Sequence, residues 1–192
     1  MRLFSGFTGD GVLPPGDYPL TLDDLENSML VLGPGEPRSH PVWDAAWRSR
    51  LVANLRVMVE QLWAVGIDQI FIDGSFVEDK DHPNDIDGYF VCEALRFASG
   101  QLEHDLNLLD PAKCWTWDHR SRRAYRGYPK LQLPMWHAYR VELYPHFAGL
   151  IAGEDEHGHP LEFPAFFRKR RGNGAPKGII RIIKHATKDD PS

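Results

Sequence analysis

The stretch of sequence that decides the fold is residues 70–91, IFIDGSFVEDKDHPNDIDGYFV. It begins inside a short β-branched and aromatic run, residues 68–73, which predicts a strand that ends at a Gly-Ser pair. The polar residues 77–84 predict a loop. Residues 85–91 alternate polar and apolar side chains and then become apolar, which predicts a second strand that enters the core. The stretch therefore predicts two strands joined by a turn and a polar loop.

Two features of this stretch indicate chemistry. Gly74 lets the backbone approach a ligand closely, Ser75 adds a hydroxyl, and backbone N–H groups at such a turn can hold phosphate oxygens. Asp85 and Asp87 lie two residues apart on the second strand, so their side chains point to the same face. Crowded carboxylates repel each other unless a cation lies between them, and such oxygen-rich sites suit Mg²⁺ or Mn²⁺. The alternative is that both aspartates only cap backbone N–H groups where the strand starts.

A third carboxylate, Glu142, lies in another alternating run, residues 137–144, which predicts a further strand. The residues on either side of Glu142 are apolar, so its side chain is expected on the face opposite theirs. If this strand lies beside residues 85–91, the three carboxylates converge. The alternative is that Glu142 only pairs with Arg140 or Arg126.

The rest of the chain predicts a mixture of helices and short strands. Thr21 is a suitable N-cap for a helix over residues 22–30, and residues 41–64 have the apolar stripe of a long amphipathic helix. Further elements are expected as a helix over 100–110, irregular chain over 115–135, a short helix over 163–171, a turn over 172–178 and a strand over 178–183. The expected fold class is α+β, a small mixed β-sheet flanked by helices.

Length and composition fit one globular domain. The chain has 192 residues, of which 42% are hydrophobic and 26% charged, with a formal net charge of −5. These values exclude a disordered, collagen-like or coiled-coil chain. We expect a single domain over residues 1–192, with an extended and helical leader over 1–40 and a basic C-terminal segment over 163–192. Cys92 and Cys114 are too few for a disulfide framework or a cysteine-based zinc site.

The sequence also bears on location. No run approaches the roughly 20 apolar residues of a membrane-spanning helix, and the N-terminal residues lack the apolar core of a signal peptide. We therefore expect a cytoplasmic protein that contacts no membrane, and the sequence indicates no oligomeric state.

Charge is distributed unevenly along the chain. Residues 73–87 carry six acids and one base, whereas residues 119–141 and 163–188 contain arginines and lysines and no acid. An acidic loop flanked by two basic stretches suits metal ions together with a polyanionic substrate. In the second basic stretch, Lys177 follows a glycine-rich turn that is able to close over phosphate, so we expect this stretch to hold a phosphate-bearing ligand. The alternative for each basic stretch is a solvated surface.

The order of these motifs resembles the polymerase-beta-type nucleotidyltransferase superfamily. Its pattern is a strand that ends in Gly-Ser, an Asp-x-Asp on the next strand and a third acid on a further strand. Small bacterial and prophage members are similar in several short motifs, which here are DGSFV at 73–77, PNDID at 83–87, LPPG at 13–16, TLDDL at 21–25 and PKGII at 176–180.

The resemblance implies a role for each motif. Gly74 and Ser75 would hold the β- and γ-phosphates of a nucleoside triphosphate (NTP) such as ATP. Asp85 and Asp87 would bind two metal ions, Mg²⁺ or Mn²⁺, and Glu142 would complete the site of the metal that activates the attacking hydroxyl. This third acid is usually Asp in the family, so a Glu is a departure. A second departure is that large members carry a helical domain for the acceptor, for which this chain is short.

The implied activity is transfer of a nucleoside monophosphate from an NTP to a hydroxyl group with loss of pyrophosphate. From its place in the basic C-terminal stretch, Lys177 is expected to help bind the NTP. The acceptor classes are an RNA or tRNA end, a protein side chain or a small molecule such as an aminoglycoside, and toxin–antitoxin or phage-defence settings are common for small members. The basic residues 163–188 favour a polyanionic acceptor. One alternative is a nucleotide- or protein-binding module that has kept the fold and lost turnover. Another is a phosphohydrolase that uses the same carboxylates on a different fold.

Overall fold

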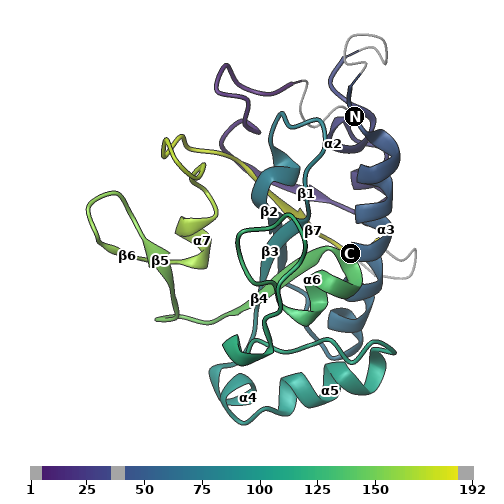
Figure 1. The fold of residues 1–192 in the computed structure, drawn as a ribbon, viewed down its shortest axis with the longest axis vertical. Coiled ribbons are helices and arrows are strands. Elements are labelled where there is room, and N and C mark those ends of the chain that lie inside the picture. The colour runs from purple at the N-terminus through teal and green to yellow at the C-terminus, as the bar shows by residue number, and fades with distance from the viewer. Residues whose placement is uncertain (1–5, 36–41, 186–192) are drawn as a thin grey trace, which may run out of the picture.

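A five-stranded mixed sheet forms the centre of the computed structural model, which describes residues 6–35 and 42–185 (Figure 1). The strand order is β1-β7-β2-β3-β4, with β1 at Asp17–Leu20, β2 at Ile70–Asp73, β3 at Ile86–Val91, β4 at Val141–His146 and β7 at Ile179–Ile182. Strand β2 runs antiparallel to both of its neighbours, whereas the pairs β1–β7 and β3–β4 are parallel. The predicted α+β fold class is confirmed.

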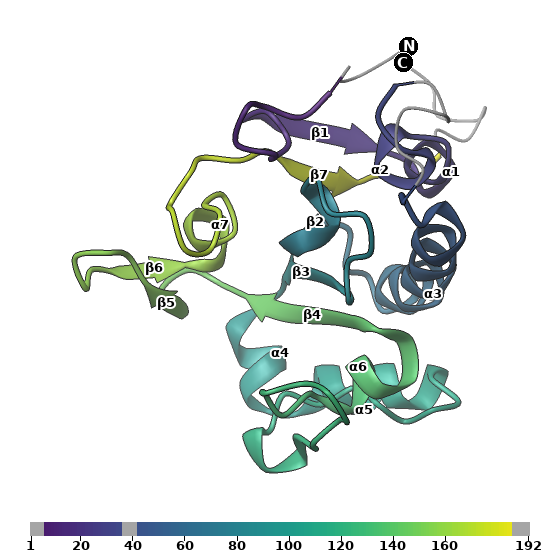
Figure 2. The same ribbon diagram turned by 45° about the horizontal axis from the view of Figure 1, so that its top comes forward.

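Helices cover the two faces of the sheet unequally (Figure 2). One face carries α1 (Leu22–Glu26), α2 (Met29–Leu32) and the long α3 (Ala45–Ala64). The other carries α7 (Phe163–Phe166) and a separate hairpin of β5 (Ile151–Glu154) and β6 (Pro160–Glu162). Beyond β4 lie α4 (Ala94–Ala98), α5 (Gln101–Leu109) and α6 (Pro134–Tyr139), and two short 3₁₀ helices occupy Gly74–Val77 and His119–Ser121.

Alternation along the strands gives the sheet two different faces. The side chains towards α3 form the main core, in which the fully buried sheet residues are Ile70, Ile72, Ile86, Phe90, Val141, Leu143, Ile180 and Ile182. The opposite face carries a smaller aromatic cluster, in which Tyr89 stacks on Phe71 at 4.7 Å between ring centroids and on Phe167 at 5.9 Å. This face is only partly covered, and a cleft opens on it. The candidate site lies there.

Several predicted elements differ from those observed. The strand predicted over 137–144 is wrong in its first part, because α6 continues to Tyr139 and Arg140 then takes a left-handed conformation at φ 57°. Pro134 explains the helix, since a proline in the first helical turn sacrifices no hydrogen bond. The short helix predicted over 163–171 ends at Phe166, and the helix predicted over 22–30 is divided in two by a second N-cap at Ser28.

The leader supplies an edge strand, β1, in a segment that was expected to be only extended or helical. Parts of the predicted segments lie outside the described residues, namely 1–5 and 36–40 of the leader, Pro41 at the start of the predicted long helix, and 186–192 of the basic C-terminal segment. Within the described ranges, none of the helices has the length and apolar character needed to cross a membrane.

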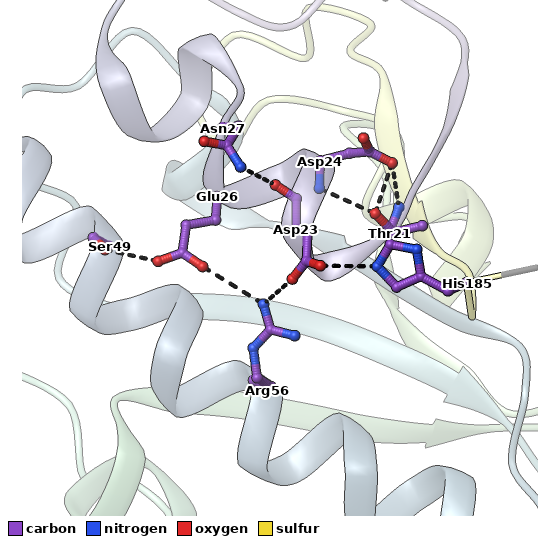
Figure 3. Close-up of polar contacts among 8 residues, drawn as sticks. All are labelled: Thr21, Asp23, Asp24, Glu26, Asn27, Ser49, Arg56 and His185. Atoms are coloured by element: carbon purple, nitrogen blue, oxygen red, sulfur yellow. Dashed lines mark hydrogen bonds and ion pairs between the residues drawn. The ribbon is translucent and has the colours of Figure 1, made fainter.

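A polar network ties the leader to the rest of the molecule (Figure 3). Thr21 and Asp24 form a capping box at the start of α1. Asp23, just before Asp24, accepts a hydrogen bond from Arg56 of α3 at 2.7 Å and lies 2.9 Å from Nε2 of His185, which follows β7. Arg56 also lies 3.5 Å from Glu26. These contacts are largely exposed, so solvent screens them and each contributes little to stability.

A buried arginine holds the part of the chain that follows the Gly-Ser turn. Arg48 of α3 is fully buried. Its Nη1 donates to the carbonyls of Leu30 and Phe76 at 2.6 and 2.8 Å, and its Nη2 donates to those of Lys80 and Glu78 at 2.6 and 3.3 Å. Burial lowers the pKa of Arg48 to about 9, which leaves the guanidinium charged at neutral pH. The loop that leads from the turn to β3 is therefore held by a charged group in the core.

Candidate active site

Three carboxylates form a row across the partly open face of the sheet. Asp73 ends β2, Asp87 lies on β3 and Glu142 lies on β4, and the strand register pairs Asp73 with Asp87 and Asp87 with Glu142. Asp85 precedes β3 and lines the same cleft as Asp87 and Glu142. The structure thus places Asp85, Asp87 and Glu142 together, as the sequence predicted, because β3 and β4 are neighbours. It adds Asp73 as a fourth acid.

Glu142 is almost completely buried and both of its oxygens are engaged. Its Oε1 accepts a hydrogen bond from the Leu133 N–H at 3.0 Å and lies 3.7 Å from Arg122, and its Oε2 accepts a hydrogen bond from the Tyr144 hydroxyl. Burial and the adjacent Glu142 raise the pKa of Tyr144, so that the phenol remains a donor.

The expected alternative partners of Glu142, Arg140 and Arg126, are not the ones observed. The guanidinium of Arg140 stacks over the Trp136 ring at 3.8 Å instead, and within the described residues Arg126 forms no ion pair. Arg122 takes their place because its loop runs alongside β4.

Asp85 and Asp87 differ in how they are held. Asp85 Oδ2 accepts a hydrogen bond from Trp136 Nε1 at 2.7 Å. The carboxylate of Asp87 has no hydrogen bond or ion pair with any residue of the described ranges. Burial raises the pKa of Asp87 well above its usual value, and Asp85 and Glu142 raise it further; burial also raises the pKa of Asp85. Negative charge is therefore crowded at this point, as expected of a site that binds a cation.

The Gly-Ser turn packs directly against Asp87. Gly74 has φ +74°, and a Cβ atom there would lie 2.5 Å from Asp87 Oδ2 and 2.9 Å from Asp87 Cβ. The Gly74 N–H donates to Asp73 Oδ1 at 2.6 Å, and Ser75 lines the cleft. The sequence predicted that Gly74 lets the backbone approach a ligand closely. In the structure the turn lies close to a carboxylate of the same chain, Asp87.

Replacing Gly74 by alanine is expected to destabilise the fold by roughly 2–3 kcal/mol, because the change combines a strained φ with displacement of Asp87. The matched control is Gly66→Ala, which has φ +83° and no atom within 4 Å of the added Cβ. Chemical denaturation of both variants isolates the contact with Asp87. Equal losses of stability in the two variants would contradict a tight fit between Gly74 and Asp87.

A buried ion-pair cluster lies on the other side of the turn. Lys177 Nζ is 2.5 Å from Asp73 Oδ1, 2.9 Å from Glu78 Oε1 and 3.2 Å from the Gly74 carbonyl oxygen. Asp73 is fully buried and its Oδ2 has no hydrogen-bond partner. Burial raises the pKa of Asp73 to about 7 although Lys177 opposes the shift. Lys177, which the sequence predicted to hold a phosphate-bearing ligand, thus reaches the Gly-Ser turn and is held there by two acids.

Asp73 was missed as a site residue by sequence reasoning, which counted it only as part of an acidic stretch. The signal that could have found it is the alternation along β2, in which Ile70 and Ile72 face the core and Asp73 faces away. Its pairing with Lys177, distant in the sequence, has no local signature.

A cleft of about 1220 Å³ lies over the carboxylates. Its wall includes the four site residues Asp85, Asp87, Glu142 and Lys177 together with the Gly-Ser turn. Further cationic residues line it, namely Lys80, Arg122, Lys130, Lys169, Arg170 and Arg171. The acids Glu78, Glu154, Asp155 and Glu156 line the cleft as well, so cations and acids both surround the central carboxylates. Cations close to a carboxylate cluster suit a metal ion with a phosphate-bearing ligand.

The basic residues 168–171 are less available than the sequence suggested. Arg168 pairs with Asp17 at 2.5 Å, Lys169 with Glu156 at 3.4 Å and Arg170 with Glu78 at 3.6 Å. Arg171 is exposed and forms no ion pair with the described part of the chain. The neighbouring acids neutralise most of this run.

The residues present fit a divalent cation in charge and donor type, although in the described residues no group of three or more His, Cys, Asp or Glu side chains is arranged as a ready metal site. Asp87 has an unengaged carboxylate, and Asp73 has an unpartnered buried oxygen. Carboxylate oxygens are the donors that Mg²⁺ and Mn²⁺ prefer. Asp85 and Asp87 would hold such an ion.

In EDTA, the folded protein is expected to lose stability as the pH rises from about 5 to about 8. Asp73, Asp85 and Asp87 have pKa values raised by burial, so they bind more protons in the folded state and their contribution is lost as the pH rises through the folded values, about 7 for Asp73. His146 acts in the opposite direction, because burial lowers its pKa.

The comparison that isolates the carboxylates is wild type against Asp87→Asn, in urea denaturation across this range. The variant should show a shallower decline, and Mg²⁺ should stabilise wild type more at pH 8 than at pH 5. Parallel pH profiles would show that Asp87 is not perturbed.

The sequence matches the model of a protein family along residues 5–183, almost the whole chain. The description of the family states no activity, so the match carries no function. No curated protein and no solved structure is significantly similar to the chain. On the extent of the match, the chain belongs to the family of unknown function DUF6932.

Proposed function

We propose that this protein is a metal-dependent nucleotidyltransferase that moves a nucleoside monophosphate from an NTP to a hydroxyl group of an acceptor. The observation that carries the proposal is the in-register row of Asp73, Asp87 and Glu142, with the Gly-Ser turn packed against Asp87. Acids on neighbouring strands beside such a turn are the arrangement that the resemblance to polymerase-beta-type enzymes implies. The proposal extends to a cytoplasmic setting.

The side chains around the cleft have separable roles in this proposal. Asp85 and Asp87 would hold Mg²⁺ or Mn²⁺, which supplies positive charge opposite the phosphate oxygens. Trp136 fixes the orientation of Asp85 through its indole N–H. Ser75 and Lys177, at the turn, would bind the phosphates of the NTP. Arg171, exposed on the cleft wall without an ion pair among the described residues, is the further cation available to them.

Glu142 would take a positioning role in the arrangement described. Its oxygens accept from the Leu133 N–H and the Tyr144 hydroxyl, which ties the loop before α6 to β4. Asp73, with one unpartnered oxygen next to Asp87, is then the better candidate for a third acid at the metal.

The test is incubation of the purified protein with each α-³²P-labelled NTP, Mg²⁺ and a cell extract. The expected result is one preferred nucleotide transferred to an acceptor, with loss of label when EDTA is added. Absence of transfer and of pyrophosphate release with all four nucleotides would overturn the proposal.

A second candidate is a nucleotide-binding module without turnover. The engaged oxygens of Glu142 and the lack of a ready metal group in the described residues favour it. It predicts NTP binding that EDTA does not change, measured by equilibrium dialysis, and no labelled product. The enzyme proposal predicts binding that strengthens with Mg²⁺.

A further inference from the structure

The loop between the end of α5 and α6 carries exposed cations that have no acidic partners. We infer that this loop, residues 119–133, is the docking surface for a single-stranded nucleic acid, which on the proposed function is the acceptor. The cations are Arg120, Arg123, Arg126 and Lys130, all exposed and none in an ion pair with a described residue. The basic run at 168–170 is instead neutralised by acids, so the surface lies at 119–133 and not at the C-terminal segment.

The loop is built into the carboxylate site. Arg123 and Gln132 exchange two backbone hydrogen bonds, at 2.9 and 2.8 Å, which close the loop on itself. Its base contacts Glu142 through Arg122 and the Leu133 N–H. A nucleic-acid strand bound to the loop would therefore lie next to the acids on β3 and β4.

An aromatic cluster beside the cations suits unstacked bases. Tyr125 is 40% exposed. Its ring packs at 5.2 Å against Trp136 and 5.4 Å against Tyr128, and the Arg140 guanidinium lies over it at 4.2 Å. The ring is thus held in place and still accessible, and Trp136 in turn holds Asp85.

Exposed aromatic rings among cations are typical of single-strand sites, because every base offers a face for stacking and every nucleotide a phosphate. A duplex hides its bases, and a protein partner would require acidic side chains to match the cations. These features favour a single strand.

The test measures fluorescence anisotropy of labelled single-stranded RNA, single-stranded DNA and a matched duplex, in EDTA so that no transfer occurs. Binding should weaken with salt, and Arg123→Ala/Arg126→Ala should reduce the log–log slope by about 0.7 for each phosphate that the variant no longer binds. The control, Arg168→Ala/Lys169→Ala, removes cations that are already paired and should change the affinity by less than about twofold. The RNA and DNA arms distinguish the two sources of single strand.

A second pair of variants tests stacking. Tyr125→Ala should weaken binding at least about fivefold, since one stacked base contributes that much or more, whereas Tyr125→Phe keeps the ring and should bind as wild type. Thermal melts of both variants confirm folding.

Three results would overturn the inference: no salt-dependent binding of single strands, equal reductions in affinity for the two double variants, or duplex binding as tight as single-strand binding. The inference and the proposed function fail separately. Asp87→Asn should bind the nucleic acid as wild type does. If wild type binds the nucleic acid without transfer, the proposed function is overturned and the docking surface is retained. Transfer to a protein without nucleic-acid binding would do the reverse.

Discussion

Replacing Asp87 by asparagine is expected to reduce nucleotidyl transfer at least about a thousandfold, because the cation that the carboxylates hold contributes several kcal/mol to stabilisation of the phosphate charge. The folded protein should survive the change. Asp87 makes no hydrogen bond within the described residues, and its burial beside Asp85 and Glu142 is unfavourable. Removal of one charge relieves that repulsion, so the unfolding free energy in EDTA should stay the same or rise at pH 8.

The measurements are transfer from labelled NTP and urea denaturation of the same preparation. Asp81→Asn is the matched control, since Asp81 is an exposed acid of the loop before β3, and it should retain both activity and stability. A variant of Asp87 that unfolds in EDTA at the temperature where wild type is stable would make the aspartate structural. A folded variant with full activity would remove it from catalysis.

Arg48→Met is expected to lower the unfolding free energy by about 3–5 kcal/mol. Methionine fills similar space but leaves the carbonyls of Leu30 and Phe76 without their donor inside the core, and each unsatisfied carbonyl costs about 1–3 kcal/mol. The variant also lacks the stacking of the guanidinium over Trp43 at 3.9 Å. At roughly 2–4 °C per kcal/mol for a chain of this size, the melting temperature should fall by about 10 °C.

Arg56→Ala provides the comparison on the same helix. Arg56 is one third exposed and binds the half-exposed Asp23 (Figure 3). Its removal should lower the unfolding free energy much less than Arg48→Met does, because solvent screens an exposed ion pair. Calorimetry of both variants tests whether burial separates the two arginines. Similar decreases in stability would mean that the Arg48 carbonyl contacts contribute no more than a surface ion pair.

Much of the fold follows from periodicity in the sequence. The long helix α3 and the strands β2 and β3 have regular apolar spacing, which depends only on nearby residues. Strand β1 has four residues and includes Pro19, and it is a strand because it pairs with β7 at the other end of the chain. No local pattern contains that partner.

The residues of the site likewise divide into those that the local sequence predicts and those that depend on distant partners. Asp85, Asp87 and the Gly-Ser turn lie within one short stretch whose spacing determines which way they point. Asp73 and Arg48 are charged residues that the fold buries, and burial of a charge depends on partners supplied from elsewhere, Lys177 in one case and backbone carbonyls in the other. The alternation along β2 places Asp73 on the face opposite Ile70 and Ile72, but the burial of either charge depends on these distant partners.

The position of β7 has a consequence for synthesis on the ribosome. β7 is the last strand of the sheet in the chain, and it lies between β1 and β2. Until residue 182 has left the exit tunnel, β1 has no partner in the sheet and β2 has one bare edge. Lys177, just before β7, reaches Asp73 at the same late moment. The nascent polypeptide therefore exposes an unpaired strand edge until β7 has emerged, and during this period chaperone binding would protect it from aggregation.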